Sequence, residues 1–208
     1  MNDSFVSPIF PLGTPLLPGG WLPLQIFELR YQMMLDDCLA SSPAAFGVVL
    51  IERGSEVGGG DTRSAFGTLA EVVRVDELPD GRRAVLARGT ERFRVREWLT
   101  DDPYPRAEIE PWPDEIDAEI DEGTWSALGE VVDRLVALAS EQPERARAEL
   151  ALRADETDDD HLFRLANELP LGPADRQRVL GSAGRAERSR HLLDALLDLE
   201  AIVRFRRS

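Results

Sequence analysis

The first half of the chain carries the hydrophobic spacing of short β-strands. Residues 92–96 and 106–110 are apolar at every second position, so each is expected to be a strand with one buried and one wet face. The apolar runs at residues 46–51 and 84–87 and the valine-rich residues 69–75 are also compatible with strands. Short strands at this spacing predict a small barrel or sandwich.

Turn residues and one helical pattern separate these strands. Pro79-Asp80-Gly81 and Gly89-Thr90 have the composition of turns, and the glycine-rich residues 54–64 are expected to form a flexible loop. Between residues 27 and 40, apolar side chains recur mostly three and four positions apart, which predicts a helix that ends at Ser41-Ser42-Pro43.

The second half of the chain has the spacing of helices. Residues 114–122 hold six acids and no base, which indicates a solvated linker or an exposed helix start. From Thr124 one apolar stripe predicts a helix that stops near Pro143. Residues 155–160 are expected to be a loop whose last residue, Asp160, caps the next helix. Pro170–Pro173 should break that helix, and a final helix carries leucine or valine at positions 192, 196, 199 and 203.

Composition narrows the choice of partner and compartment. The net charge of -15 disfavours binding to nucleic acid and to anionic membranes. No run of about 18 apolar residues is present that could span a bilayer, and the N-terminal residues lack the features of a signal peptide. With Cys38 as its one cysteine, the chain cannot form an internal disulfide. We therefore expect a cytoplasmic protein that has no membrane partner.

The sequence contains no lysine, which excludes several kinds of enzyme. A phosphate-binding P-loop, a Ser-Lys dyad and a Schiff-base site each require a lysine. Neither histidine, His161 or His191, has neighbours at metal-ligand spacing, and Cys38 on the apolar side of a helix is better explained as a core thiol than as a nucleophile. We predict no catalytic residue, no metal site and no cofactor.

A family resemblance rests on motifs in the N-terminal half. The motifs are, in order, Ile9–Leu12 (IFPL), Leu17–Gly19 (LPG), Leu22–Tyr31 (LPLQIFELRY), Phe46–Val49 (FGVV), Gly67–Ala70 (GTLA), Leu78–Arg82 (LPDGR) and Gly89–Val95 (GTERFRV). This series resembles the substrate-binding N-terminal domain of Lon proteases. Leu169–Leu171 followed by Arg176–Leu180 is similar to the helical part of that domain, though more loosely.

The resemblance implies an α+β fold: a PUA-like β-barrel over residues 1–113 and a helical subdomain over residues 124–208, joined by an acidic linker at residues 114–123. It implies a non-catalytic module that binds unfolded or flexible polypeptide segments, acting as an adaptor for a separate protease. Because Lon proteases continue into an ATPase module and a Ser-Lys peptidase domain, which this lysine-free sequence could not host, proteolysis is not carried over.

Two clusters are candidates for the binding surface. Trp21, Phe27 and Tyr31 surround the expected entry into the first helix and could form the rim of a groove for polypeptide or simply pack in the core. Arg92, Arg94 and Arg96 should project from one strand face, either as a solvated face paired with nearby acids or as a patch for an acidic partner. Two alternatives remain. One is RNA binding through the arginine face, as in other PUA-like folds. The other is a pocket for a small ligand in the barrel.

Overall fold

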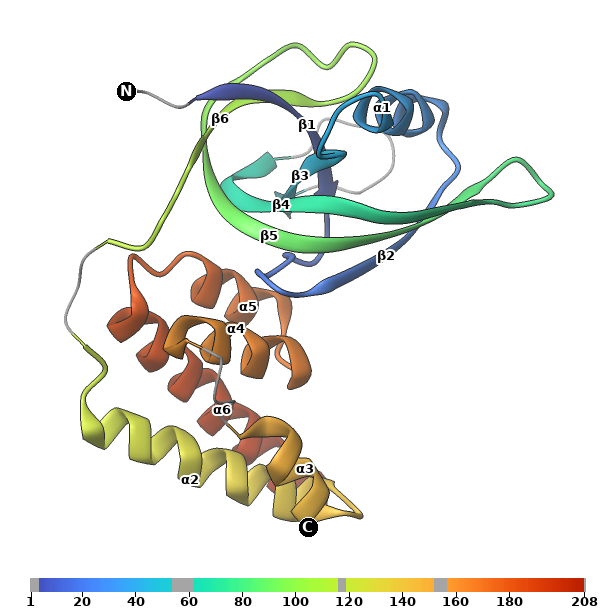
Figure 1. Ribbon diagram of the computed structural model, residues 1–208. Coiled ribbons are helices and arrows are strands. Elements are labelled where there is room, and N and C mark those ends of the chain that lie inside the picture. The colour runs from blue at the N-terminus through green and yellow to red at the C-terminus, as the bar shows by residue number, and fades with distance from the viewer. Residues whose placement is uncertain (1–3, 54–61, 116–118, 152–156, 208) are drawn as a thin grey trace. The chain divides into compact units, whose positions relative to one another are not determined.

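A computed structural model describes residues 4–53, 62–115, 119–151 and 157–207 of the chain (Figure 1). The described residues form an α+β protein of six strands and six helices, and their contacts separate two compact units, residues 1–113 and 114–208. The first unit, which we call the barrel unit, contains β1 (Phe5–Leu12), β2 (Trp21–Ile26), α1 (Leu29–Leu39), β3 (Ala45–Arg53), β4 (Thr62–Glu77), β5 (Arg83–Trp98) and β6 (Arg106–Pro111). We call the second the helical unit. The second contains α2 (Glu122–Ala139), α3 (Pro143–Leu150), α4 (Asp158–Glu168), α5 (Pro173–Leu180) and α6 (Arg185–Arg207).

The six strands form one mixed sheet that closes on itself. Their order is β2-β5-β4-β3-β1-β6, and β6 pairs in addition with β5. The ring therefore runs β5-β4-β3-β1-β6 and back to β5, with β1 and β3 as its one parallel pair. β2 lies outside the ring and pairs only with the first part of β5, so the described residues leave its other edge free.

Two apolar clusters fill the barrel unit. One consists of Ile9, Val49, Phe93, Ala107 and Ile109, so the inward positions predicted for β5 and β6 are confirmed. The other joins the sheet to α1 through the helical stripe Tyr31, Met34, Leu35 and Cys38. The predicted first helix is thus confirmed, with its buried side packed on the sheet.

The prediction of a turn at Gly89-Thr90 is wrong. β5 continues for 16 residues through this point, and its pairing with β4 shifts register there, between Thr68 and Ala70. A Cβ on Gly89 would collide with the carbonyl oxygen of Leu17, so a close approach of two backbones explains this glycine. The expected turn at Pro79-Asp80-Gly81 does occur, and Gly81 has a φ of +81°.

The helical unit is organised around α6. This helix of 23 residues contacts α2, α4 and α5, and α3 packs on α2. Leu192 and Leu196 of its predicted apolar stripe are buried, whereas Leu199 and Val203 are half-buried. Asp160 does not cap α4, because the N-cap is Thr157, whose hydroxyl accepts a hydrogen bond from the Asp160 amide. Residues 54–61, in the predicted glycine loop, lie outside the described residues.

A charged pair is built into the helical unit. The Arg188 side chain on α6 is completely buried and donates hydrogen bonds from both Nη atoms to the carboxylate of Asp114, at 2.7 and 2.5 Å. Its guanidinium also lies 4.2 Å from the ring centroid of Phe163. Asp114 is therefore held by a buried side chain, although the sequence predicted a solvated linker or an exposed helix start over residues 114–122.

Close backbone packing surrounds Gly67 in the barrel unit. A Cβ at this position would overlap the Val48 carbonyl oxygen in β3, and neither backbone can move without breaking the β3–β4 ladder. We expect Gly67→Ala to lower the free energy of unfolding by about 1–3 kcal/mol. Gly129→Ala is the matched control, because Gly129 lies exposed within α2 with open space at its Cβ, and it should raise stability by about 0.5–1 kcal/mol. Urea unfolding measures both, and equal effects would contradict the prediction.

Asp114 supplies the two carboxylate oxygens that accept hydrogen bonds from the buried Arg188 guanidinium, and losing them weakens the compensation of its charge. Asp114→Ala should therefore destabilise the helical unit by about 3 kcal/mol. The double variant Asp114→Ala with Arg188→Met removes the charge as well and should recover part of that loss. Loss of the helical circular dichroism signal on heating reports this unit. A double variant less stable than Asp114→Ala would show that stacking on Phe163, and not the ion pair, dominates.

Candidate functional site

The structure separates the three aromatic residues predicted to surround the helix entry. Tyr31 is 4% exposed and stacks on Phe10 with ring centroids 4.3 Å apart, so it belongs to the core and cannot form part of a groove rim. Trp21 and Phe27 are exposed, but they lie at opposite ends of β2, about 20 Å apart at the usual rise per residue.

An exposed apolar surface nevertheless lies where β2 runs into α1. Phe27, Leu29 and Met33 are 59%, 72% and 44% exposed, and we call these three residues the corner patch. Leu29 and Met33 are four residues apart on α1 and lie on the side opposite the buried stripe. Phe27 directly precedes the N-cap of α1, where an apolar residue often packs against the fourth residue of the helix. Here that fourth residue is the polar Gln32, so Phe27 has no apolar partner at this position. The Gln32 side-chain amide donates hydrogen bonds to the Phe27 and Gly81 carbonyls.

A groove lies on the outer face of the sheet beside β2. Its volume is about 360 Å³, and it is lined by residues 23–25 of β2, residues 84–86 of β5 and Asp76 of β4. Pro23 lies opposite Leu86 and Gln25 opposite Ala84 in the β2–β5 ladder, so their side chains share this face. Trp21 is 57% exposed at one end of the same face, next to Arg88.

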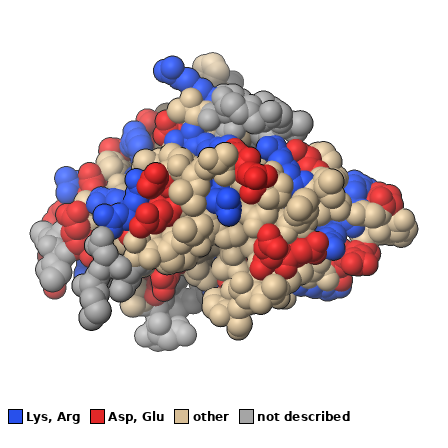
Figure 2. Space-filling model, turned by 90° about the horizontal axis from the view of Figure 1, so that it is seen from above, with Lys and Arg blue, Asp and Glu red and all other residues tan. Residues whose placement is uncertain are grey.

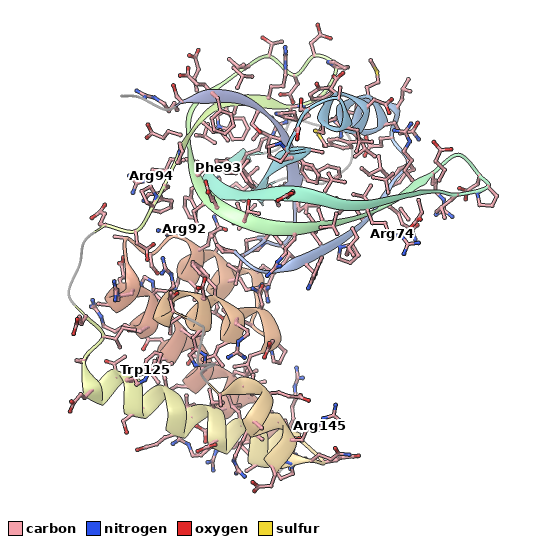
Figure 3. The ribbon with its side chains drawn as sticks, in the orientation of Figure 1. Arg74, Arg92, Phe93, Arg94, Trp125 and Arg145 are labelled. Carbon is pink, nitrogen blue, oxygen red and sulfur yellow. The ribbon has the colours of Figure 1, made fainter. Side chains whose placement is uncertain are left out.

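The three predicted arginines of β5 are engaged by their own unit. Arg92 is only 5% exposed, which contradicts its predicted place on a wet face. Its guanidinium lies 4.4 Å from the ring centroid of Trp112, and that of Arg94 lies 4.0 Å from the same ring. Arg96 pairs with Glu110 at 3.2 Å. Figure 3 shows Arg92 and Arg94 together on β5, far from Arg74 at the hairpin end of the barrel unit.

Charged side chains of both signs also occur away from these three arginines. Figure 2 shows acidic and basic side chains interspersed over the face that it presents. On the β4–β5 hairpin, Arg74 pairs with Asp76 and Arg82 with Asp80. The described residues contain no group of three His, Cys, Asp or Glu side chains placed to hold a metal ion. Within the same residues, no helix has the length and hydropathy needed to cross a bilayer.

Cys38 is a core thiol, as the sequence predicted. It is 3% exposed within α1, and burial together with the charge of Asp37 raises its pKa to about 11. The nearby Tyr104 hydroxyl donates to the Asp37 carboxylate at 2.5 Å, and burial and this bond raise the pKa of Tyr104 to about 12. Both groups are therefore protonated at neutral pH and are unsuited to act as nucleophiles.

The helical unit contains a second cavity, which the sequence did not indicate. Its volume is about 350 Å³, and it lies among α2, α3 and α4 with Trp125, Leu128, Val132, Leu165 and His161 in its lining (Figure 3 labels Trp125). His161 is 7% exposed, so this histidine is buried within the helical unit. Its Nδ1 lies 2.9 Å from Arg164, and its ring meets Trp125 edge-on at 5.6 Å.

Comparison with known proteins gives a consistent picture. A family model described as the ATP-dependent protease La (LON) substrate-binding domain matches residues 6–198. Lon protease of Flavobacterium johnsoniae is 26% identical over 184 residues, which are 88% of this chain and 22% of that protein. The LON peptidase N-terminal domain and RING finger protein C14F5.10c of Schizosaccharomyces pombe is 34% identical over 99 residues, 42% of this chain and 20% of that protein.

A solved structure supports the same grouping. The Lon N-terminal domain protein from Xanthomonas campestris matches with a TM-score of 0.68 and 28% identity, covering 91% of this chain and 98% of that one. The chain thus spans about a fifth of the length of these two curated relatives, and nearly the whole of the solved domain.

The raised pKa of Cys38 makes stability depend on alkaline pH. Because the thiol has a pKa of 9.0 when unfolded and about 11 when folded, its contribution is complete below pH 9 and is lost as pH rises towards 11. We expect the free energy of unfolding to fall by roughly 1 kcal/mol between pH 8 and pH 10. In Cys38→Ala this fall should largely disappear, while Tyr104→Phe should change the slope only above pH 10. Urea unfolding across this pH range would contradict the assignment if Cys38→Ala kept the full wild-type slope.

Proposed function

Because the chain belongs to the ATP-dependent protease La (LON) substrate-binding domain family, we propose that it binds apolar segments of unfolded polypeptides without catalysing a reaction on them. Its match to Lon proteases is confined to about a fifth of their length, and the family model is of the substrate-binding part. Without lysine the sequence cannot supply the Ser-Lys dyad or the P-loop of such a protease. We further propose that it delivers clients, as a cytoplasmic adaptor, to a separate protease.

The corner patch is the observation that carries this proposal. Phe27, Leu29 and Met33 occupy consecutive outward positions between β2 and the second turn of α1, and all three are at least 44% exposed. Apolar side chains grouped on a surface lose contact with water when a partner covers them, at about 25 cal/mol per Å². Unfolded polypeptides expose the large apolar side chains that can provide such cover, whereas folded proteins bury most of theirs.

RNA binding through the β5 arginines is less well supported. A surface that binds RNA phosphates needs guanidinium groups exposed to the solvent. Arg92 is buried, however, while Arg94 stacks on Trp112 and Arg96 pairs with Glu110. The net charge of -15 adds repulsion. The cavity among α2, α3 and α4 is the better place for a small ligand, but its lining combines apolar residues with Asp133, Arg147 and His161 and does not identify a ligand class.

Replacing the corner patch with serine tests the proposal. The triple variant Phe27→Ser, Leu29→Ser, Met33→Ser should bind reduced, carboxymethylated lactalbumin at least about tenfold more weakly, because each residue offers apolar area worth up to about 1.5 kcal/mol. Fluorescence anisotropy of the labelled client gives the affinity.

The matched control carries serine at two exposed apolar positions of α6, Ile202→Ser and Phe205→Ser, and should bind as the wild type does. Since all five positions are exposed, neither variant should lose much stability, which thermal unfolding verifies. Equal weakening in both variants, or unchanged affinity in the triple variant, would remove the corner patch as the binding surface.

A further inference from the structure

The free edge of β2 lies beside the outer groove, which Pro23 and Gln25 of this strand help to line. Hydrogen bonds just outside the strands show which backbone groups face this edge. The Gly89 amide donates to the Gly20 carbonyl at 2.8 Å, and the Gly89 carbonyl accepts from the Gly19 amide at 2.9 Å, so Gly89 directs both backbone groups towards β2 and the Gly20 carbonyl faces β5. The β2–β5 register has no shift, so hydrogen-bonded pairs follow at every second residue. These pairs are Leu22 with Ala87, Leu24 with Val85 and Ile26 with Arg83.

Pairing on the other side of β5 agrees with this assignment. The Leu78 amide donates to the Arg82 carbonyl at 2.8 Å, just beyond the ends of β4 and β5. Because hydrogen-bonded pairs recur at every second residue, the next one is Asp76 with Ala84. The backbone N–H and C=O groups of Ala84 therefore point towards β4, and those of Arg83 and Val85 point towards β2. It follows that Trp21, Pro23 and Gln25 point their backbone groups away from β5, towards the free edge.

This edge has a definite pattern of donors and acceptors. Trp21 and Gln25 each offer an amide and a carbonyl, whereas Pro23 between them offers only a carbonyl. Because Pro23 lies opposite Leu86 in a non-hydrogen-bonded pair, its missing N–H costs the β2–β5 ladder nothing. The side chains of the same three residues lie on the exposed outer face beside the groove of about 360 Å³.

Pro23 also decides which kind of strand fits. Two copies of β2 paired antiparallel about their centre would bring Pro23 against Pro23, and both bonds of the central pair would be lost. A different chain loses only one, since its own amide can still donate to the Pro23 carbonyl. The edge therefore disfavours a second copy of this chain and accepts an unrelated extended segment.

We propose that an extended segment of client polypeptide adds to the free edge of β2 as a further strand, with apolar side chains at alternate positions over Trp21 and Pro23. This inference rests on the proposed function, and it specifies how that client is held. The edge ends at Gln25 and Ile26, directly before Phe27, so a strand bound there continues onto the corner patch. Backbone pairing accepts any sequence, and the groove and patch select apolar ones.

The test removes one outward amide and nothing else from the backbone. Gln25→Pro deletes the Gln25 donor without breaking the β2–β5 ladder, and Gln25→Ala is its matched control, since both lose the side-chain bond from Arg82 to Gln25. The probe is a labelled peptide with valine at every second position, threonine between, and lysines at both ends. We expect Gln25→Pro to bind it roughly tenfold more weakly than Gln25→Ala does. A version of the peptide N-methylated at alternate residues should lose affinity for the wild type.

Two further readouts, hydrogen exchange and sedimentation, separate the outcomes. In the wild type, the Trp21 and Gln25 amides should gain protection from hydrogen exchange when the peptide binds, which tests the idea even if Gln25→Pro fails to fold. Equal affinities for Gln25→Pro and Gln25→Ala, with no such protection, would overturn strand addition while leaving the corner-patch variant to decide the proposed function. A wild-type dimer that Gln25→Pro converts to a monomer in sedimentation would instead assign the edge to self-association and overturn the proposal.

Discussion

The backbone ladder of β5 is the constraint on which the barrel unit depends. This single strand pairs with β4 over residues 83–94, with β2 over residues 83–88 and with β6 over residues 93–98. The exchange of partners from β2 to β6 closes the ring and leaves β2 outside it. An edge strand therefore follows from the topology itself, and with it the groove on the outer face and the corner where β2 turns into α1.

Strands and helices whose apolar residues recur at a regular spacing could be predicted from the sequence, and those without such a spacing could not. The alternation at residues 92–96 and the stripe from Tyr31 to Cys38 report burial on one face, and both elements are present. α3 was missed because none of its residues is buried, so it has no apolar stripe to detect. β5 was divided at Gly89 because a glycine before a threonine has the composition of a turn, whether the backbone bends or only needs room.

The candidate site shows a similar limit. Tyr31 could have been assigned to the core, since it falls on the same helical stripe as Met34, Leu35 and Cys38. The signal for the corner patch was also present, because Leu29 and Met33 are apolar residues off that stripe. Arg92 could not have been placed, because its burial depends on Trp112, which follows it by 20 residues and crosses to it only when β5 pairs with β6. Exposure set by partners distant in sequence is not encoded in local spacing.

The burial of Cys38 also determines which labelling chemistry the native chain allows. Its thiol is shielded and protonated, and the sequence has neither a second cysteine nor a lysine. A maleimide should therefore attach only to a cysteine introduced on the surface, and among side chains an amine-directed cross-linker should find its targets on the client alone. A bifunctional reagent carrying both groups would thus join one chosen position of this chain to the lysines of a bound polypeptide, and the path of that polypeptide could be traced residue by residue.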